Sequence, residues 1–313
     1  MPTLLDARSL ALAGRNEEAV RLIQQLADAG DRDAIFMLAE MTWRGGLVPQ
    51  DSHAGRKLYE AAAGNARAEI YATNLLGSGI AGARDWQEAR RRLEAEAARD
   101  PARRRAADLL KAMALDDEGN PESLPDPQIL SQRPVVKIFP KLMTGAECRY
   151  LIDLATPGYQ PSMVFDDNAQ LVRDPIRTSD GSTIHWLIED PVVHALNRRI
   201  AAATGTAYES GETLQSLRYE PGQEYRPHFD FVPGNNRRLW TALLYLNDDY
   251  LGGETEFVET GLKVRGGIGD LLVFGNAGPD GDLEPLSRHA GLPVTGGIKY
   301  LATRWIREQR WIP

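Results

Sequence analysis

The sequence predicts an α+β protein in which a helical region precedes a β-rich region. Over residues 1–116 apolar residues recur at helical spacing, and strand-like runs do not occur. From Pro134 the pattern changes to short β-branched and aromatic runs, which after Thr213 are separated by Gly, Asn and Pro. We therefore expect a helical-repeat domain over 1–116, a linker over 117–133, and a second domain over 134–313 built on a jelly roll or barrel.

The helical region carries a degenerate repeat. The stretches Gly30-Asp31-Arg32-Asp33-Ala34 and Gly64-Asn65-Ala66-Arg67-Ala68 each open a predicted helix. Their first glycines are about 34 residues apart, which is the period of tetratricopeptide helix pairs. The first unit resembles a Sel1-type repeat. Three roles stay open for this region: a lid, a surface that docks a protein partner, or a stabilising helical cap.

Between and beyond these repeats, local signals predict the next elements. Residues 117–133 carry several prolines and acidic residues, which discourage a continuing helix. Val135–Phe139 reads as a strand, and Thr144 begins a capping box at the start of a helix. A polar loop is expected at 166–169, and a second helix at 190–200.

Composition and charge limit the class of protein. The 313 residues carry a formal net charge of −8, so we expect the arginine clusters at 90–92 and 103–105 to be solvated helix faces rather than a nucleic-acid site. No apolar run approaches the roughly 20 residues that span a bilayer, and the N-terminus lacks the pattern of a signal peptide. Cys148 is the only cysteine, which excludes an intrachain disulfide. We expect a cytoplasmic protein without a nucleic-acid or membrane partner.

The strongest chemical signal lies in the stretch Tyr225–Asp230. His228 and Asp230 are two positions apart, so on a β-strand their side chains would project from the same face. An imidazole and a carboxylate are two of the three ligands in the facial triad that holds non-heme Fe(II). His289 follows, after a Gly-rich run and several strand-like segments, as a candidate third ligand, and Lys299 follows as a cation for an acidic cosubstrate. A buried structural histidine and a surface lysine are the alternatives, and the ordered combination favours the metal site.

The stretch Leu217–Asp230, LRYEPGQEYRPHFD, resembles the catalytic core of the prolyl 4-hydroxylases, which are Fe(II)- and 2-oxoglutarate-dependent dioxygenases. The resemblance covers roughly residues 134–310 and continues in order through Thr241–Asn247, Gly252–Thr255, Gly269–Phe274, Arg288–Gly291 and Lys299–Trp305, with Arg177-Thr178-Ser179 upstream. It implies a double-stranded β-helix with supporting helices. It also implies that an unactivated C–H is hydroxylated while 2-oxoglutarate and O2 give succinate and carbon dioxide.

The resemblance further implies roles for individual residues. Three match the metal ligands at the catalytic centre: His228, Asp230 and His289. Four match positions that bind the cosubstrate, the first of them through its distal carboxylate: Lys299, Tyr219, Tyr245 and Thr255. Three match positions that line the substrate site: Tyr225, Arg238 and Trp305. The implied cofactor is Fe(II), with 2-oxoglutarate and O2 as cosubstrates and ascorbate as a candidate accessory reductant.

One departure from the family bears on the substrate. Plant-type members have histidine where this chain has Arg307, and an arginine can bind a carboxylate in a bidentate pair. Because Trp305 and Arg307 would share a strand face, we expect Arg238 or Arg307 to bind a substrate carboxylate. This favours a free cyclic imino acid such as proline or pipecolic acid. The alternatives are a prolyl residue in a peptide or protein and, from another class, a catalytically silent interaction scaffold.

Overall fold

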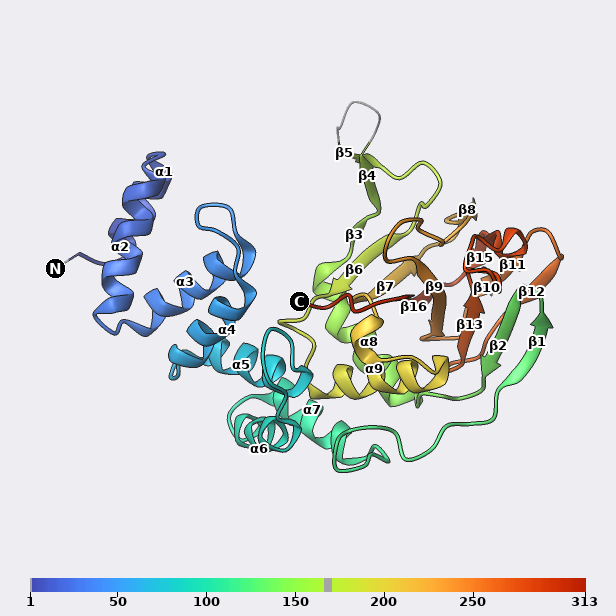
Figure 1. Cartoon of the computed structure of the whole chain (residues 1–313), viewed down its shortest axis with the longest axis horizontal. Coiled ribbons are helices and arrows are strands. Elements are labelled where there is room, and N and C mark those ends of the chain that lie inside the picture. Colours follow the sequence, from blue (N-terminus) through green and yellow to red (C-terminus); the bar gives the residue numbers. More distant parts are fainter. Residues whose placement is uncertain (1, 166–170) are drawn as a thin grey trace. The chain divides into compact units, whose positions relative to one another are not determined.

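The computed structural model describes residues 2–165 and 171–313, and the chain divides into two compact units (Figure 1). The first unit comprises the residues up to Lys111, the segment Trp186–His194 and the terminal Pro313. The second comprises Ala112–His185 and Ala195–Ile312. The segment Trp186–His194 thus belongs by its contacts to the helical unit, although it lies within the second expected domain. The polar loop expected at 166–169 lies outside the described residues.

The first unit is built from helices in succession: α1 (Leu4–Leu12), α2 (Asn16–Asp28), α3 (Arg32–Arg44), α4 (Ser52–Ala61), α5 (Ala66–Ser78), α6 (Trp86–Ala97) and α7 (Pro101–Lys111). Their capping residues repeat. Asp31 caps α3 and Asn65 caps α5, while Asp51 caps α4 and Asp85 caps α6. Each side-chain oxygen accepts from backbone N–H groups of the first helical turn. Asp31 and Asn65 are as far apart in the sequence as the two repeat glycines, and so are Asp51 and Asp85. The predicted period therefore reappears in the capping residues of two successive helix pairs.

In its described residues, the second unit holds two antiparallel sheets and two short strand pairs. The larger sheet has the order β1 (Gln128–Gln132), β2 (Val135–Phe139), β13 (Leu271–Gly275), β9 (Arg238–Tyr245), β16 (Lys299–Arg307), β7 (Leu214–Tyr219), β6 (Asp180–Ile184) and β3 (Gln160–Pro161). The smaller has the order β12 (Leu262–Val264), β11 (Thr255–Phe257), β14 (His289–Gly291) and β8 (Tyr225–His228). The pairs are β10 (Leu251–Gly252) with β15 (Val294–Gly296), and β4 (Met163–Phe165) with β5 (Leu171–Arg173). The expected linker thus contains a strand, β1.

The core of the second unit contains side chains from both sheets. The larger sheet contributes Leu272 and Phe274 from β13 and Leu243 from β9, while the smaller contributes Phe257 from β11 and Val264 from β12. The rings of Phe257 and Phe274 meet edge to face, with centroids 5.1 Å apart. Two antiparallel sheets that share one core form the double-stranded β-helix, or jelly roll, that the resemblance implied.

Two helices accompany the sheets: α8 (Gly145–Ala155) and α9 (Pro191–Thr204). The predicted capping box is confirmed, because the Thr144 hydroxyl accepts from Glu147 N at 3.2 Å and the Glu147 carboxylate accepts from Thr144 N at 2.7 Å. Asp190 caps α9 by accepting from a backbone N–H of its first turn. Arg304 of β16 donates to the carbonyl of Asn197 at 3.0 Å, which attaches α9 to the larger sheet. The short 3-10 helices are η1 (Thr156–Gly158), η2 (Tyr208–Ser210) and η3 (Pro285–Ser287).

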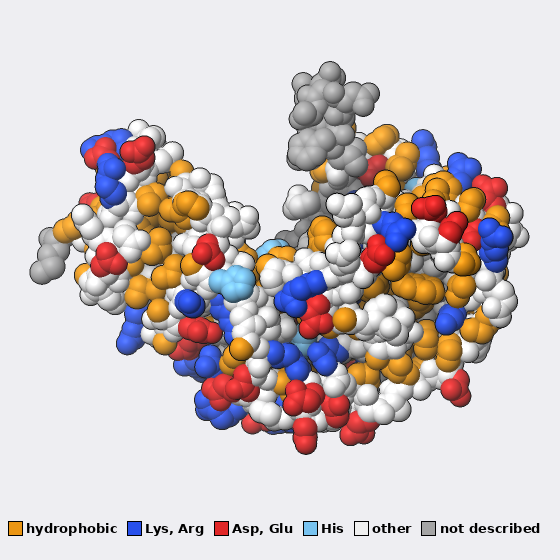
Figure 2. All heavy atoms as spheres, viewed as in Figure 1, with side chains coloured by type: hydrophobic (Ala, Val, Ile, Leu, Met, Phe, Trp, Pro, Cys, Tyr) orange, Lys and Arg blue, Asp and Glu red, His pale blue; other side chains and the backbone are white. Residues whose placement is uncertain are grey.

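Charged side chains of both signs are interspersed over the face shown in Figure 2. In the first arginine cluster, Arg91 and Arg92 both pair with Glu88 near the surface, as expected for a solvated helix face. In the second cluster Arg103 differs from the expectation, because it is buried and donates to Glu96 at 2.6 Å. None of the helices within the described ranges combines the length and apolar character needed to cross a membrane.

Candidate active site

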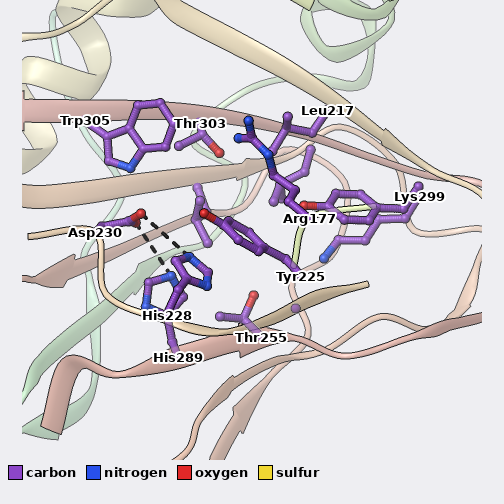
Figure 3. Close-up of a pocket in the computed structure, with 14 residues that line it drawn as sticks. Arg177, Leu217, Tyr225, His228, Asp230, Thr255, His289, Lys299, Thr303 and Trp305 are labelled. Atoms are coloured by element: carbon purple, nitrogen blue, oxygen red, sulfur yellow. Dashed lines mark ion pairs between the residues drawn. The ribbon is translucent and has the colours of Figure 1, made fainter. Parts of the chain in front are cut away.

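Two histidines and an aspartate converge in one pocket of the second unit (Figure 3). Strand β8 ends at His228 and β14 begins at His289, and the antiparallel register places these two residues directly opposite each other. Asp230 follows β8 and reaches both rings: its oxygens lie 3.7 Å from His228 Nε2 and 3.6 Å from His289 Nε2. The ligand atoms of all three lie within 4.8 Å of one another. They are therefore placed to hold one metal ion.

Each imidazole is oriented by a backbone carbonyl. His228 Nδ1 lies 2.8 Å from the carbonyl oxygen of Arg226, and His289 Nδ1 lies 2.9 Å from that of Ser287. Because a carbonyl only accepts, Nδ1 carries the proton in each ring and Nε2 presents its lone pair beside Asp230. Burial lowers the pKa of His228 to about 4, so its imidazole is neutral and able to ligate a metal at neutral pH.

The Asp230 carboxylate is oriented by polar side chains of the larger sheet. The Thr241 hydroxyl donates to Asp230 at 2.8 Å, and the Asn276 amide donates to Thr241 at 2.9 Å. Burial opposes ionisation of Asp230, but at low pH, where the imidazoles are protonated, their positive charge and the Thr241 hydroxyl favour it and keep the pKa of the carboxyl below its usual value. Two imidazoles and one ionised carboxylate on one side of a pocket are a ligand set that suits non-heme Fe(II).

Lys299 lies further along the same pocket as a buried cation. It pairs with Tyr219 across β16 and β7, and its Nζ donates to the carbonyl of Gly253 at 2.7 Å. The ammonium lies 5.5–5.9 Å from the ring centroids of Tyr219, Tyr245 and Tyr250. Burial lowers its pKa to about 8, and among the described residues it forms no ion pair with a carboxylate. Such a cation can accept an anionic ligand group.

Tyr219, Tyr245 and Thr255 carry the three hydroxyl groups that the resemblance assigned to the cosubstrate. Tyr219 and Thr255 line the pocket with Lys299, whereas Tyr245 does not line it and its hydroxyl lies 3.4 Å from Thr255 Oγ1. Burial raises the pKa of the phenols of Tyr219 and Tyr245, so both stay protonated. Protonated hydroxyls are hydrogen-bond donors for a carboxylate.

Tyr225, Trp305 and Arg177 line the pocket around the converging triad. The ring of Tyr225 stacks on His228, with centroids 3.4 Å apart and an interplanar angle of 16°. The Arg177 guanidinium carbon lies 5.5 Å from the Tyr225 ring centroid. Sequence reasoning gave Arg177 no role, and its only signal was the resemblance of Arg177-Thr178-Ser179 to the family pattern.

Arg238 and Arg307 bind the same internal carboxylate. Arg238 donates through Nε and Nη2 to Glu212 at 2.6 and 2.8 Å, and Arg307 Nε donates to Glu212 Oε1 at 2.5 Å. From the sequence we expected one of these arginines to bind the carboxylate of a substrate, because an unpaired guanidinium is costly away from water. Glu212 takes that place, so this argument for a free imino acid no longer holds. No local pattern marks Glu212, which lies far before Arg238 in the chain.

Comparisons with known proteins place the site in a wider group. Residues 214–307 match the model of the 2OG-Fe(II) oxygenase superfamily. The Arabidopsis thaliana protein prolyl 4-hydroxylase 1 is 34% identical over 204 residues, which are 58% of this chain and 72% of that protein. Prolyl 4-hydroxylase 5 of the same plant is 34% identical over 216 residues, which are 61% of this chain and 73% of that protein. A solved viral collagen prolyl hydroxylase from Paramecium Bursaria Chlorella virus-1 is 25% identical, with a TM-score of 0.44, and covers 55% of this chain and 95% of its own.

Proposed function

Because the chain belongs to the prolyl 4-hydroxylase family of 2-oxoglutarate- and Fe(II)-dependent oxygenases, we propose that it hydroxylates prolyl residues within a peptide or protein. It is a 2-oxoglutarate-dependent hydroxylase, with Fe(II) as cofactor and 2-oxoglutarate and O2 as cosubstrates. One observation carries the choice of a peptidyl substrate. Glu212 already pairs with both Arg238 and Arg307, so neither guanidinium lacks a carboxylate partner that a free amino acid would have to supply. The name of the prolyl 4-hydroxylase relative agrees with this choice.

In this proposal, His228, Asp230 and His289 hold the iron. The carbonyls at Arg226 and Ser287 accept from Nδ1 of the two rings, which would leave each Nε2 to bind the metal. Bound iron, with 2-oxoglutarate and O2, supplies the oxidation that converts a C–H to a C–OH. The carboxylate of Asp230 is held in one orientation by the Thr241 hydroxyl.

Lys299 binds the distal carboxylate of 2-oxoglutarate. The buried ammonium supplies a positive charge at the pocket end lined also by Tyr219 and Thr255. These two hydroxyls donate hydrogen bonds to the bound cosubstrate, and the buried surroundings strengthen the charge interaction. Lys299 and these hydroxyls would thereby hold one end of the cosubstrate in the pocket that also contains the triad.

The prolyl ring of the substrate lies between aromatic walls. Tyr225 and Trp305 present ring surfaces beside the triad, and these surfaces exclude water and orient the apolar ring. Arg177 lines the same pocket, and its guanidinium lies over the Tyr225 ring and pairs with Asp174 at 3.8 Å. These contacts hold Tyr225 in place beside the triad.

The proposal is tested by mass spectrometry of products. The protein is incubated with Fe(II), 2-oxoglutarate and two panels of substrates: free imino acids, and peptides with an internal proline. We expect addition of one oxygen atom to the peptides, and none with His228→Ala under the same conditions. Product from free proline or pipecolic acid, with none from any internal prolyl peptide, would overturn the peptidyl assignment and leave the oxygenase class intact.

A further inference from the structure

The carboxylate of Asp230 is one end of a hydrogen-bonded chain that leads away from the pocket. Its Oδ2 accepts from the Thr241 hydroxyl at 2.8 Å, and Thr241 Oγ1 accepts from the Asn276 amide at 2.9 Å. Thr241 and Asn276 each have 0% exposure, and neither belongs to the described lining of the pocket. The chain is therefore shielded from solvent, and Asn276 reaches the metal ligand through Thr241.

The chemistry of the three groups fixes the direction of each hydrogen bond. An ionised carboxylate only accepts, so the single proton of the Thr241 hydroxyl points at Asp230. The hydroxyl then offers only lone pairs to Asn276, and the side-chain amide must present its NH2 group. Asn276 Oδ1 also lies 3.3 Å from the hydroxyl, but the Asp230 oxygen is nearer and charged, which makes it the stronger acceptor. The Asn276 amide thus directs the Thr241 proton towards the metal ligand.

The backbone holds both members of this pair in place. The N–H of Asn276 donates to Leu239 O at 2.8 Å, and its carbonyl accepts from Glu284 N at 3.0 Å. Thr241 lies on β9, which pairs with β13 on one side and β16 on the other. Both side chains therefore start from backbone that is fixed by hydrogen bonds, which preorganises the contact between them.

We propose that Asn276 is a positioning residue of the metal centre, which acts through Thr241 to hold Asp230 in the orientation that binds the metal. The inference rests on the ligand set proposed above and is independent of the choice of substrate. Loss of a hydrogen-bond partner behind a metal ligand typically lowers metal affinity about 10- to 100-fold. Thr241→Val should therefore raise the Kd for the metal by roughly ten- to a hundredfold. Asn276→Leu should raise it by roughly three- to tenfold, because the hydroxyl still reaches Asp230 but is no longer directed towards it.

The test measures binding of the metal alone, without cosubstrate or substrate. Co(II) replaces Fe(II) as the probe because it does not oxidise in air, and its visible absorption reports the Kd of each variant. If Asn276 acts through Thr241, the double variant Thr241→Val/Asn276→Leu should bind Co(II) no more weakly than Thr241→Val. Two independent roles would instead multiply the two losses.

Stability should change in a different order from metal affinity. Thr241→Val leaves the buried Asn276 amide without its acceptor, whereas the double variant removes both polar groups together. Urea unfolding should therefore show a higher midpoint for the double variant than for Thr241→Val, although the two bind Co(II) equally. A purely structural role of the pair would make affinity follow stability.

Two further variants separate positioning from folding. Thr241→Ser keeps the hydroxyl and should retain most of the affinity. Asn197→Leu makes the same amide-to-leucine change at another fully buried position, whose side chain makes no hydrogen bond with the described residues. This control should leave the Kd unchanged.

The inference is overturned if Asn276→Leu binds Co(II) as tightly as wild type, or if the double variant loses both factors. Asn276→Ala repeats the measurement where leucine prevents folding. Wild type that binds no Co(II), or binding that survives His228→Ala, overturns the ligand set itself.

Discussion

Replacing Lys299 with methionine should stabilise the unliganded protein while it weakens cosubstrate binding. The pKa of this buried ammonium is lowered from an ordinary value of 10.5 to about 8, which corresponds to about 3 kcal/mol of unfavourable burial. Methionine also removes the hydrogen bond to Gly253 O, which is worth about 1 kcal/mol. The net gain in the free energy of unfolding should be about 2 kcal/mol at about pH 7.

The gain should depend on pH in a defined direction. Below about pH 8 the folded protein must keep the ammonium charged in an apolar site, so the penalty is fully present. As the pH rises from about 8 towards the unfolded value of about 10.5, the unfolded state binds more protons and the penalty disappears. Urea unfolding of wild type and Lys299→Met at about pH 7 and about pH 10 measures this difference. A methionine variant that is less stable than wild type at both values would refute the reasoning.

Binding of 2-oxoglutarate should change in the opposite sense. Loss of a charge-assisted contact costs about 1.5–3 kcal/mol, so the Kd of Lys299→Met should rise roughly ten- to a hundredfold. In wild type the affinity should be constant below about pH 8 and fall roughly tenfold per pH unit above it, because only the ammonium binds the carboxylate. Lys299→Arg keeps its charge throughout and should show no such fall. Anaerobic titration calorimetry measures both effects, and the same pH dependence in the arginine variant would assign it to another group.

Three further outcomes follow from the other contacts of the structure. His228→Ala and Asp230→Ala should each lose bound iron and succinate formation while keeping the wild-type circular dichroism, and undiminished turnover in both would contradict the assignment of the ligands. Glu212→Gln leaves two partly buried guanidiniums without their carboxylate, so its free energy of unfolding should fall by about 2–4 kcal/mol in urea, and an unchanged urea midpoint would show that the pairs contribute nothing. Removal of residues 1–111 should lower the thermal midpoint of the remaining chain, because Leu187 O loses the Asn74 amide that donates to it at 2.8 Å, and an unchanged midpoint would show that Trp186–His194 does not need the helical unit.

Features set by neighbouring residues could be predicted from the sequence. The capping box at Thr144 depends only on the geometry of one helical turn. The capping residues Asp31 and Asn65 show the helical repeat, because each side chain bonds to the first turn of its own helix. The proximity of His228 and Asp230 follows from their i, i+2 spacing. These predictions hold because the interacting groups are close along the chain, whatever the rest of the fold does.

Other parts of the site could be expected only through the family resemblance. His289 lies far from His228 along the chain, and no periodicity relates the two. The antiparallel register of β14 and β8 places them opposite each other, and the register of β16 and β7 does the same for Lys299 and Tyr219. The pairing of distant strands depends on how both sheets bury their shared core. The residues of one segment alone do not contain this information.

From the residues alone we could predict the helical and β-rich regions, the capping box at Thr144 and the proximity of His228 to Asp230. Only the tertiary structure decided the partners of the charged groups. It showed that Glu212 binds both Arg238 and Arg307, and that Trp186–His194 packs with the helical unit. The physical reason is that a charge is satisfied by whichever opposite charge the fold brings within a few ångströms. Arg238 and Arg307 therefore bind the internal carboxylate of Glu212, where the sequence suggested the carboxylate of a substrate.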